Sequence, residues 1–300
     1  MFLFSAVNAQ IKYLFSTYHS ESLGINISTQ VLLFFRICFS LIPTLLFYKG
    51  PLKELWEKSL NLPAPAKKGQ VMISILTPIS LYCLFKSFET LPLGDAQTIS
   101  FSSGIFVTLL AYPLLKEKVT PVRYVALVLG AIGIFIVSRS STPQIVEEKN
   151  WAKNFLQIGI IWGLIFSFLQ ALTTIYYKKI SNSIASEISM FYLGVIGSLF
   201  LLIFIFPSIP SILYYPKFLL LGLISVGFFG GIAQIFLLES FRYAPASLLT
   251  PFFYTSILHG ILLDYLIWNH SPFWTTLVGA TIIIASNAIL FFKEKENSKV

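Results

Sequence analysis

The residues best able to do chemistry in this sequence are charged side chains that lie inside long apolar stretches. Arg36 lies in the middle of one such stretch. A charge at that depth in a membrane costs about 3 kcal/mol by insertion scales, so it should face water or a partner. A guanidinium offers a planar pair of donors that fits a carboxylate or a phosphate. We therefore predict that Arg36 binds an anionic group; a permanent internal ion pair is the structural alternative.

Two charged pairs occur at helical spacing. Lys86 lies three residues before Glu89, and Glu239 lies three residues before Arg242, so each pair shares one helix face. The order of the signs is exchanged between the two pairs. We interpret these residues as candidates for gating or coupling that contact charge across a cavity in one state. The alternative is that both are ion pairs at helix ends whose side chains reach the interface.

His259 and Asp264 are two further titratable residues of one apolar stretch. They are five residues apart, which is about 140° around a helix. His259, nearer the middle, could carry a coupling proton because imidazole titrates near neutral pH, or it could be a hydrogen-bonded structural residue. Asp264, close to the end of the stretch, is a further candidate for gating or coupling; the simpler expectation is that it is solvated or paired.

Amide and phenol side chains form the remaining candidate set, because a polar group in hydrocarbon is costly unless it is hydrogen-bonded. Together they would line a wet cavity suited to a zwitterionic or nucleoside-like solute. The candidate substrate-binding residues beside Arg36 are Gln10, Tyr82, Gln97, Gln170, Gln234 and Tyr254. The sequence has no metal-ligand spacing of its cysteines and no phosphate-binding loop, so we expect no metal, no cofactor and no ATPase activity.

These residues must be positioned by membrane-spanning helices. Of 300 residues, 56% are hydrophobic and 11% charged, against about 25% charged in soluble domains. A spanning helix needs about 20 mainly apolar residues. Ten stretches qualify: 2–18, 28–48, 70–90, 96–115, 120–138, 154–176, 188–207, 218–240, 247–268 and 273–292. They predict an all-α polytopic membrane protein with ten transmembrane helices and no nucleic-acid partner; nine spans result if the short first stretch does not cross.

The positive charge is distributed unequally between the two sides. With a cytoplasmic N-terminus, fourteen Lys and Arg residues fall in inside connections and four in outside ones. Cytoplasmic connections of membrane proteins are enriched in Lys and Arg. We therefore expect both termini in the cytoplasm of a multi-pass protein, in a bacterial inner membrane. The net charge of +8 then faces anionic lipid; a homodimer is left open.

The chain contains an internal repeat. The polar stretch 139–153 leaves five spans on each side, and an odd number of spans inverts the second half. Residues 86–92 recur as residues 239–245, 153 positions later, with a shared Ser-Phe and a final proline. We predict a first repeat over 1–138, a linker over 139–153, a second repeat over 154–292 and a cytoplasmic tail over 293–300.

Two motifs carry a resemblance to a known family. Residues 241–247 read Phe-Arg-Tyr-Ala-Pro-Ala-Ser, and residues 114–121 read Leu-Leu-Lys-Glu-Lys-Val-Thr-Pro before a Gly130-x-x-Gly133 helix. The chain resembles the EamA-like transporter family of the drug/metabolite transporter superfamily. This resemblance implies two inverted five-helix repeats around a central cavity that opens alternately to each side. The chain departs from the family in having Ser103-Gly104 where a proline is common.

The resulting hypothesis is a secondary transporter, not an enzyme, that moves a small amino-acid-like or nucleoside-like metabolite by alternating access, coupled to protons or to exchange. Carriers that take up S-adenosylmethionine look similar in size and in the Pro251-x-x-Tyr254 segment. An efflux carrier for amino acids or drugs is the alternative of the same fold. From other classes, a structural membrane protein remains, as does an intramembrane aspartyl protease using Asp95 and Asp264. Asp95 is expected in a loop and lacks the Gly-x-Gly-Asp context.

Overall fold

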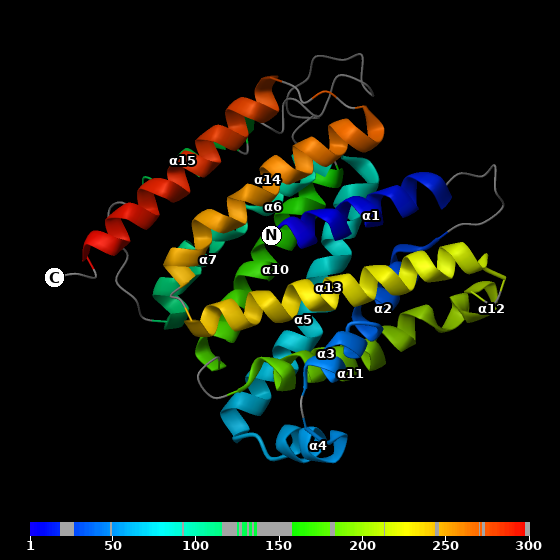
Figure 1. Cartoon of the computed structure of the whole chain (residues 1–300). Coiled ribbons are helices and arrows are strands. Elements are labelled where there is room, and N and C mark those ends of the chain that lie inside the picture. Colours follow the sequence, from blue (N-terminus) through cyan, green and yellow to red (C-terminus); the bar gives the residue numbers. More distant parts are fainter. Residues whose placement is uncertain are drawn as a thin grey trace. The chain divides into compact units, whose positions relative to one another are not determined.

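Every regular element in the described part of the computed structural model is a helix (Figure 1). The structure describes residues 1–18, 27–48, 50–91, 93–115, 125, 128–130, 132–133, 135–136, 158–180, 184–212, 214–243, 246–269, 271 and 274–297. The elements are α1 (Phe2–Tyr18), α2 (Thr29–Cys38), α3 (Leu41–Phe47), α4 (Leu52–Leu60), α5 (Ala64–Thr90), α6 (Leu93–Ser100), α7 (Ser103–Leu115), α10 (Ile158–Ile180), α11 (Ser186–Ile205), η2 (Phe206–Ser208), α12 (Ile209–Ile212), α13 (Lys217–Tyr243), α14 (Ala246–Trp268) and α15 (Trp274–Asn297).

Helices occupy the predicted apolar stretches wherever the structure describes them. Five described segments are long and apolar enough to cross a membrane, and two shorter apolar segments lie in α14 and α15. The five are Thr29–Phe47, Ala64–Thr90, Ile158–Ile180, Ser186–Ser208 and Lys217–Ser240. The third span begins at Ala64 rather than near residue 70, because Pro65 suits the first turn of a helix. Most of the predicted span 120–138 lies outside the described residues.

The repeat is visible in the helix ends. Helix α5 covers Ala64–Thr90 and α13 covers Lys217–Tyr243, so both ends are displaced by 153 residues. The segment from the start of α6 to the end of α7 covers 93–115, and α14 covers 246–268, which is the same displacement. The offset first found in a seven-residue run therefore holds over two consecutive helical segments of each repeat.

The chain forms two compact units, each built from helices of both repeats. Unit 1 comprises residues 1–9, 83–175 and 244–300; unit 2 comprises residues 10–82 and 176–243. Helices α1, α5 and α10 contribute residues to both units. The two units are described separately below.

In unit 2, the second span is broken between α2 and α3. Pro43 has no N–H to donate to the carbonyl of Phe39, which instead accepts from the N–H of Ile42 at 3.3 Å. Helix α13 packs on this break through glycines. A Cβ at Gly227 would overlap the backbone carbonyl of Phe35, and one at Gly231 would lie 2.9 Å from the Cα of Ser40. Small residues thus let the broken helix approach α13 closely.

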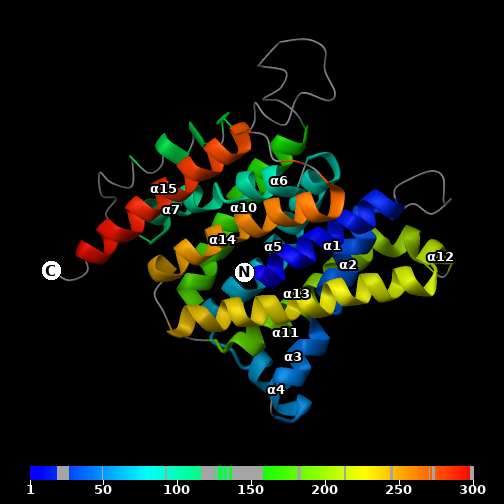
Figure 2. The ribbon, with the colours of Figure 1, turned by 45° about the horizontal axis from the view of Figure 1, so that its top comes forward.

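In unit 1, α6 packs against α14 and α15, which lie side by side in both views (Figures 1 and 2). The fourth span is broken at Phe101–Ser102, between α6 and α7. The break lies just before Ser103-Gly104, a serine–glycine pair of the kind at which helices kink. The Ser167 hydroxyl on α10 lies 3.1 Å from the carbonyls of Ile99 and Ser100, so a side chain satisfies backbone groups at the break. The segment of the second repeat that is equivalent to α6 and α7 is α14, which is unbroken.

Candidate functional site

Arg36 is buried in unit 2, in the last turn of α2. Its side chain is only 7% exposed, and its guanidinium lies against Gly230 of α13, where even a Cβ would overlap it. Among the described residues, no carboxylate lies within ion-pair distance of this guanidinium. The predicted alternative of a permanent internal ion pair therefore finds no partner in the described part of the chain.

The position of Arg36 in the helix is as informative as its burial. It lies three residues before Phe39, where α2 ends and the span breaks. Transporter sites are often built from discontinuous helices, because the backbone groups freed there face a cavity rather than lipid. A buried cation one turn from such a break can complete its hydrogen bonding with an anionic solute.

The other candidates of unit 2 differ in their surroundings. The Gln10 amide N–H group donates to the Ser225 hydroxyl at 2.6 Å and to the Gly222 carbonyl at 3.3 Å, which ties α1 to α13. Gln234 is half-buried one turn after Gly230, on the helix face that meets Arg36. Tyr82 is half-buried and has a partner of its own. Gln234 is thus the candidate amide that lies on the same helix face as the contact with Arg36.

Unit 2 also contains a buried polar pair that sequence reasoning missed. The Gln70 amide N–H donates to the Ser189 carbonyl at 3.0 Å, and the Ser189 hydroxyl donates to Gln70 Oε1 at 2.7 Å. Ser186, one turn earlier on α11, donates to Glu239 Oε2 at 2.9 Å. The sequence spacing indicates Glu239 as a candidate, whereas Gln70 lies at the edge of its predicted span, where a polar residue is ordinary. The side chain of Arg242, the predicted partner of Glu239, is outside the described set.

In unit 1, Gln97 is the most unusual polar residue. It is 2% exposed, and neither atom of its amide has a hydrogen-bond partner among the described residues. The amide lies against Gly260 of α14, where a Cβ would overlap it. A buried amide without partners costs free energy, so Gln97 is available for a ligand. It also lies one turn before the break at Phe101.

His259 precedes Gly260 on α14. Its Nδ1 is buried and has no hydrogen-bond partner among the described residues, and the ring meets Phe2 edge-on at 5.4 Å between centroids. The histidine is therefore not held by a hydrogen bond at Nδ1. Gln170 is half-buried on α10, and the side chain of Tyr254 is outside the described set.

One expectation about carboxylates is wrong. Asp95 does not lie in a loop: it belongs to the first turn of α6 and is buried, and the Thr276 hydroxyl on α15 donates to its Oδ1 at 2.7 Å. Asp264, expected to be solvated or paired, is buried and paired: its Oδ2 accepts the Gly94 N–H at 3.5 Å. The reason is the contact of α6 with α14 and α15, together with the favourable interaction of carboxylates with a helix N-terminus.

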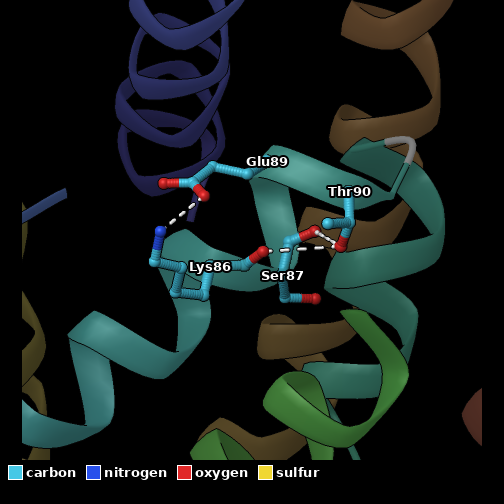
Figure 3. Close-up of polar contacts among 4 residues, drawn as sticks. All are labelled: Lys86, Ser87, Glu89 and Thr90. Atoms are coloured by element: carbon cyan, nitrogen blue, oxygen red, sulfur yellow. Dashed lines mark hydrogen bonds and ion pairs between the residues drawn. The ribbon is translucent and has the colours of Figure 1, made fainter. Parts of the chain in front are cut away.

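The pair Lys86 and Glu89 is joined within α5, with 2.8 Å between Nζ and Oε2 (Figure 3). Both side chains remain partly exposed, at 30% and 16%. The Thr90 hydroxyl donates back to the carbonyls of Lys86 and Ser87, at 3.4 and 3.3 Å. The Ser87 hydroxyl points away from the ion pair (Figure 3). The ion pair is thus formed between two residues of one helix.

Comparisons with known proteins identify the family. The profile of the EamA-like transporter family matches residues 4–139 and 157–292. The chain belongs to this family. EamA-like proteins contain the duplicated repeat observed here, so the protein is an all-helical, multi-pass membrane protein.

The relatives are transporters by name. The chain is similar to the S-adenosylmethionine uptake transporter of Rickettsia prowazekii, with 24% identity over 99% of this chain and 92% of that one. It is also similar to human solute carrier family 35 member G1, with 25% identity over 73% of this chain. The match spans 62% of the length of the human protein. A solved crystal structure with 12% identity and a TM-score of 0.61 covers 98% of both chains and shares the fold. These relatives support a membrane transporter of small metabolites.

Proposed function

We propose that this EamA-like protein is a secondary transporter that takes up a small metabolite carrying an anionic group, of the amino-acid–nucleoside type to which S-adenosylmethionine belongs. The observation that carries the proposal is Arg36, a buried guanidinium with no described ion-pair partner, one turn before the break between α2 and α3. A buried cation is costly without an anion. A solute carboxylate would supply that anion and could accept two parallel hydrogen bonds.

The substrate class is supported by the name of the Rickettsia prowazekii relative. S-adenosylmethionine has a carboxylate for a guanidinium and a purine edge for an amide. Within unit 1, Gln97 offers one acceptor and two donors that the described residues leave unused. We propose Gln97 as a solute-contacting residue on the chemistry of its own amide, because an amide can pair with a purine edge in the same way as with another amide.

The driving force is proposed to be a proton gradient, with Asp264 of α14 as the proton-binding residue. Its carboxyl is buried in the unit that also holds His259 and Asp95. A proton that binds to this carboxyl in one state and leaves it in another would bias the equilibrium between the two states. Exchange of one solute for another is the alternative, and requires no protonation step.

The experiment is uptake of labelled S-adenosylmethionine into proteoliposomes that contain the full chain, with and without an inward proton gradient. We expect saturable uptake that unlabelled substrate competes away. In Arg36→Gln the loss of a charge-assisted hydrogen bond, about 1.5–3 kcal/mol, should weaken the apparent affinity by about 10- to 150-fold. Lys217→Gln, which removes an exposed cation from the start of α13, is the matched control and should transport normally.

Two outcomes would refute the proposal. If neither S-adenosylmethionine nor any member of a panel of amino acids and nucleosides enters the vesicles, the protein is not an uptake carrier of this class. If uptake is normal in Arg36→Gln at equal protein incorporation, Arg36 does not bind the solute. The thermal unfolding midpoint of each variant in detergent separates a binding defect from a folding defect.

A further inference from the structure

Helix α4 lies in the connection between α3 and α5 and is tied to unit 2 through one face. Leu55 is fully buried in a core that includes Ile73 of α5 and Ile188 of α11. The Tyr192 hydroxyl of α11 donates to the Ser59 carbonyl at 2.5 Å. These contacts hold α4 beside the first turns of α5 and α11, next to the end of α3 (Figures 1 and 2). Helix α4 is therefore held beside the end of α3 and the beginnings of α5 and α11.

An apolar stripe on α4 stays at least half exposed within unit 2. Leu52, Trp56 and Leu60 follow one another at four-residue intervals, beside the buried face, and are 60%, 50% and 50% exposed. The Trp56 ring also meets Phe191 edge-on, with 6.0 Å between centroids. Large apolar side chains aligned on one exposed helix face indicate an interaction surface, and tryptophan is enriched where membranes meet water.

The remaining surface of α4 is charged. Lys53 pairs with Glu57 at 4.0 Å, and Lys58 pairs with Glu54 at 2.6 Å. The hydrogen bond from Lys58 to Glu54 and the charge of that carboxylate raise the pKa of the lysine, so the ammonium stays charged. The exposed Lys67–Lys68 follow at the start of α5. Helix α4 itself carries two lysines and two glutamates, and the excess of positive charge comes from Lys67 and Lys68 of α5.

The equivalent connection of the second repeat lacks this charge. Between α11 and α13, residues 206–216 contain no Lys, Arg, Asp or Glu. They form η2 and α12 and expose apolar side chains instead, Phe206 at 73% among them. A charged amphipathic helix therefore distinguishes one of the two connections, which are predicted to lie on opposite sides of the membrane.

We infer that α4 is an interfacial helix that binds the anionic surface of a phospholipid bilayer. The stripe of Leu52, Trp56 and Leu60 enters the boundary between headgroups and acyl chains, and the lysines contact lipid phosphates. An apolar stripe beside a charged face that contains lysines is the pattern of helices that lie in the plane of a membrane. Lysines near an anionic leaflet add an electrostatic attraction that salt screens. The inference does not depend on what the protein transports.

The test measures depth in the bilayer. A nitroxide is attached to Trp56→Cys of the full chain, in a background of Cys38→Ala and Cys83→Ala, and the protein is reconstituted in vesicles. Accessibility to oxygen, which concentrates in lipid, is compared with accessibility to a water-soluble nickel chelate. We expect the label at position 56 to favour oxygen and a label at Glu57→Cys to favour nickel. Leu52→Cys provides a second probe of the stripe if Trp56→Cys does not fold.

Lipid charge provides the second arm. Adding phosphatidylglycerol to phosphatidylcholine vesicles should shift the label at position 56 towards oxygen, and the combined changes Lys53→Gln and Lys58→Gln should remove this shift. Lys217→Gln, at an exposed lysine of α13, should leave it unchanged. Equal access of nickel to positions 56 and 57 would overturn the inference. So would protection of position 56 from both reagents, which would mean that protein, such as a second copy, covers the stripe.

Discussion

The guanidinium of Arg36 occupies the space that a side chain at Gly230 would need. Three residues earlier on α13, a Cβ at Gly227 would instead overlap the backbone carbonyl of Phe35. The two glycines therefore serve different purposes, although they lie on one face of the same helix. Gly227 lets two backbones approach, whereas Gly230 makes room for the flexible end of a cation. This difference separates a binding role from a packing role.

We expect Gly230→Ala to weaken solute binding without unfolding the protein. The guanidinium can swing away from the added methyl group, so the apparent affinity for substrate should fall by about tenfold, which is ~1.4 kcal/mol. Gly227→Ala forces a backbone shift, and should lower the unfolding free energy by about 1–3 kcal/mol. Transport kinetics in proteoliposomes and thermal unfolding in detergent measure the two effects. Equal loss of stability in both variants would contradict the distinction.

For Gln97 we expect a substitution that keeps or raises stability but lowers transport. Since its buried amide has no described partner, Gln97→Leu removes an unsatisfied group that costs about 1–3 kcal/mol. The thermal midpoint should stay the same or rise, while solute uptake falls. Gln10→Leu is the matched control: it removes the bond to Ser225 and should lower stability by about 1 kcal/mol. If Gln97→Leu destabilises the protein and transports normally, Gln97 is structural.

The helices could be predicted from sequence because hydrocarbon offers the backbone no hydrogen-bond partners. An apolar stretch that crosses a membrane must satisfy its N–H and C=O groups internally, and so becomes a helix. The 153-residue offset between the pairs at Lys86 and Glu239 also located the repeat, and the ends of α5 and α13 share it. The break at Pro43 was visible in the sequence but was not predicted. The break beside Ser103 had been noted only as a departure from the family.

Burial and long-range contacts could not be predicted in the same way. Asp95 stands beside a proline at a span boundary, and only the packing of α15 places Thr276 against it. Gln70 and Ser189 are 119 positions apart, and each looks ordinary within its own stretch. Helix α4 was overlooked because its charges placed it among the polar connections. The sequence signal for α4 is the four-residue spacing of its apolar side chains. The charged residues between them lower the mean hydropathy of the segment, so that an average over a window does not detect this spacing.

Exchanging the charges of Lys86 and Glu89 tests the gating hypothesis. The two residues pair within α5 and are partly exposed, and exposed ion pairs contribute about 0.2–1 kcal/mol. The combined variant Lys86→Glu and Glu89→Lys re-forms the pair and should transport within about twofold of the wild type, as should the neutral Lys86→Gln with Glu89→Gln. Uptake rates at equal incorporation provide the measurement. A large loss in the exchanged variant alone would show that each charge meets a specific partner during the transport cycle.

Asp264→Asn tests the coupling proton. The amide keeps an acceptor for the Gly94 N–H but cannot change its charge, so uptake should lose its dependence on an imposed pH gradient. Exchange of internal for external substrate needs no net protonation and should continue at a rate within a few-fold of the wild type. Asp95→Asn is the control, because its amide oxygen can still accept from Thr276, and it should retain gradient-driven uptake. If Asp264→Asn still accumulates substrate against a concentration gradient when only a pH difference drives it, the coupling proton binds elsewhere.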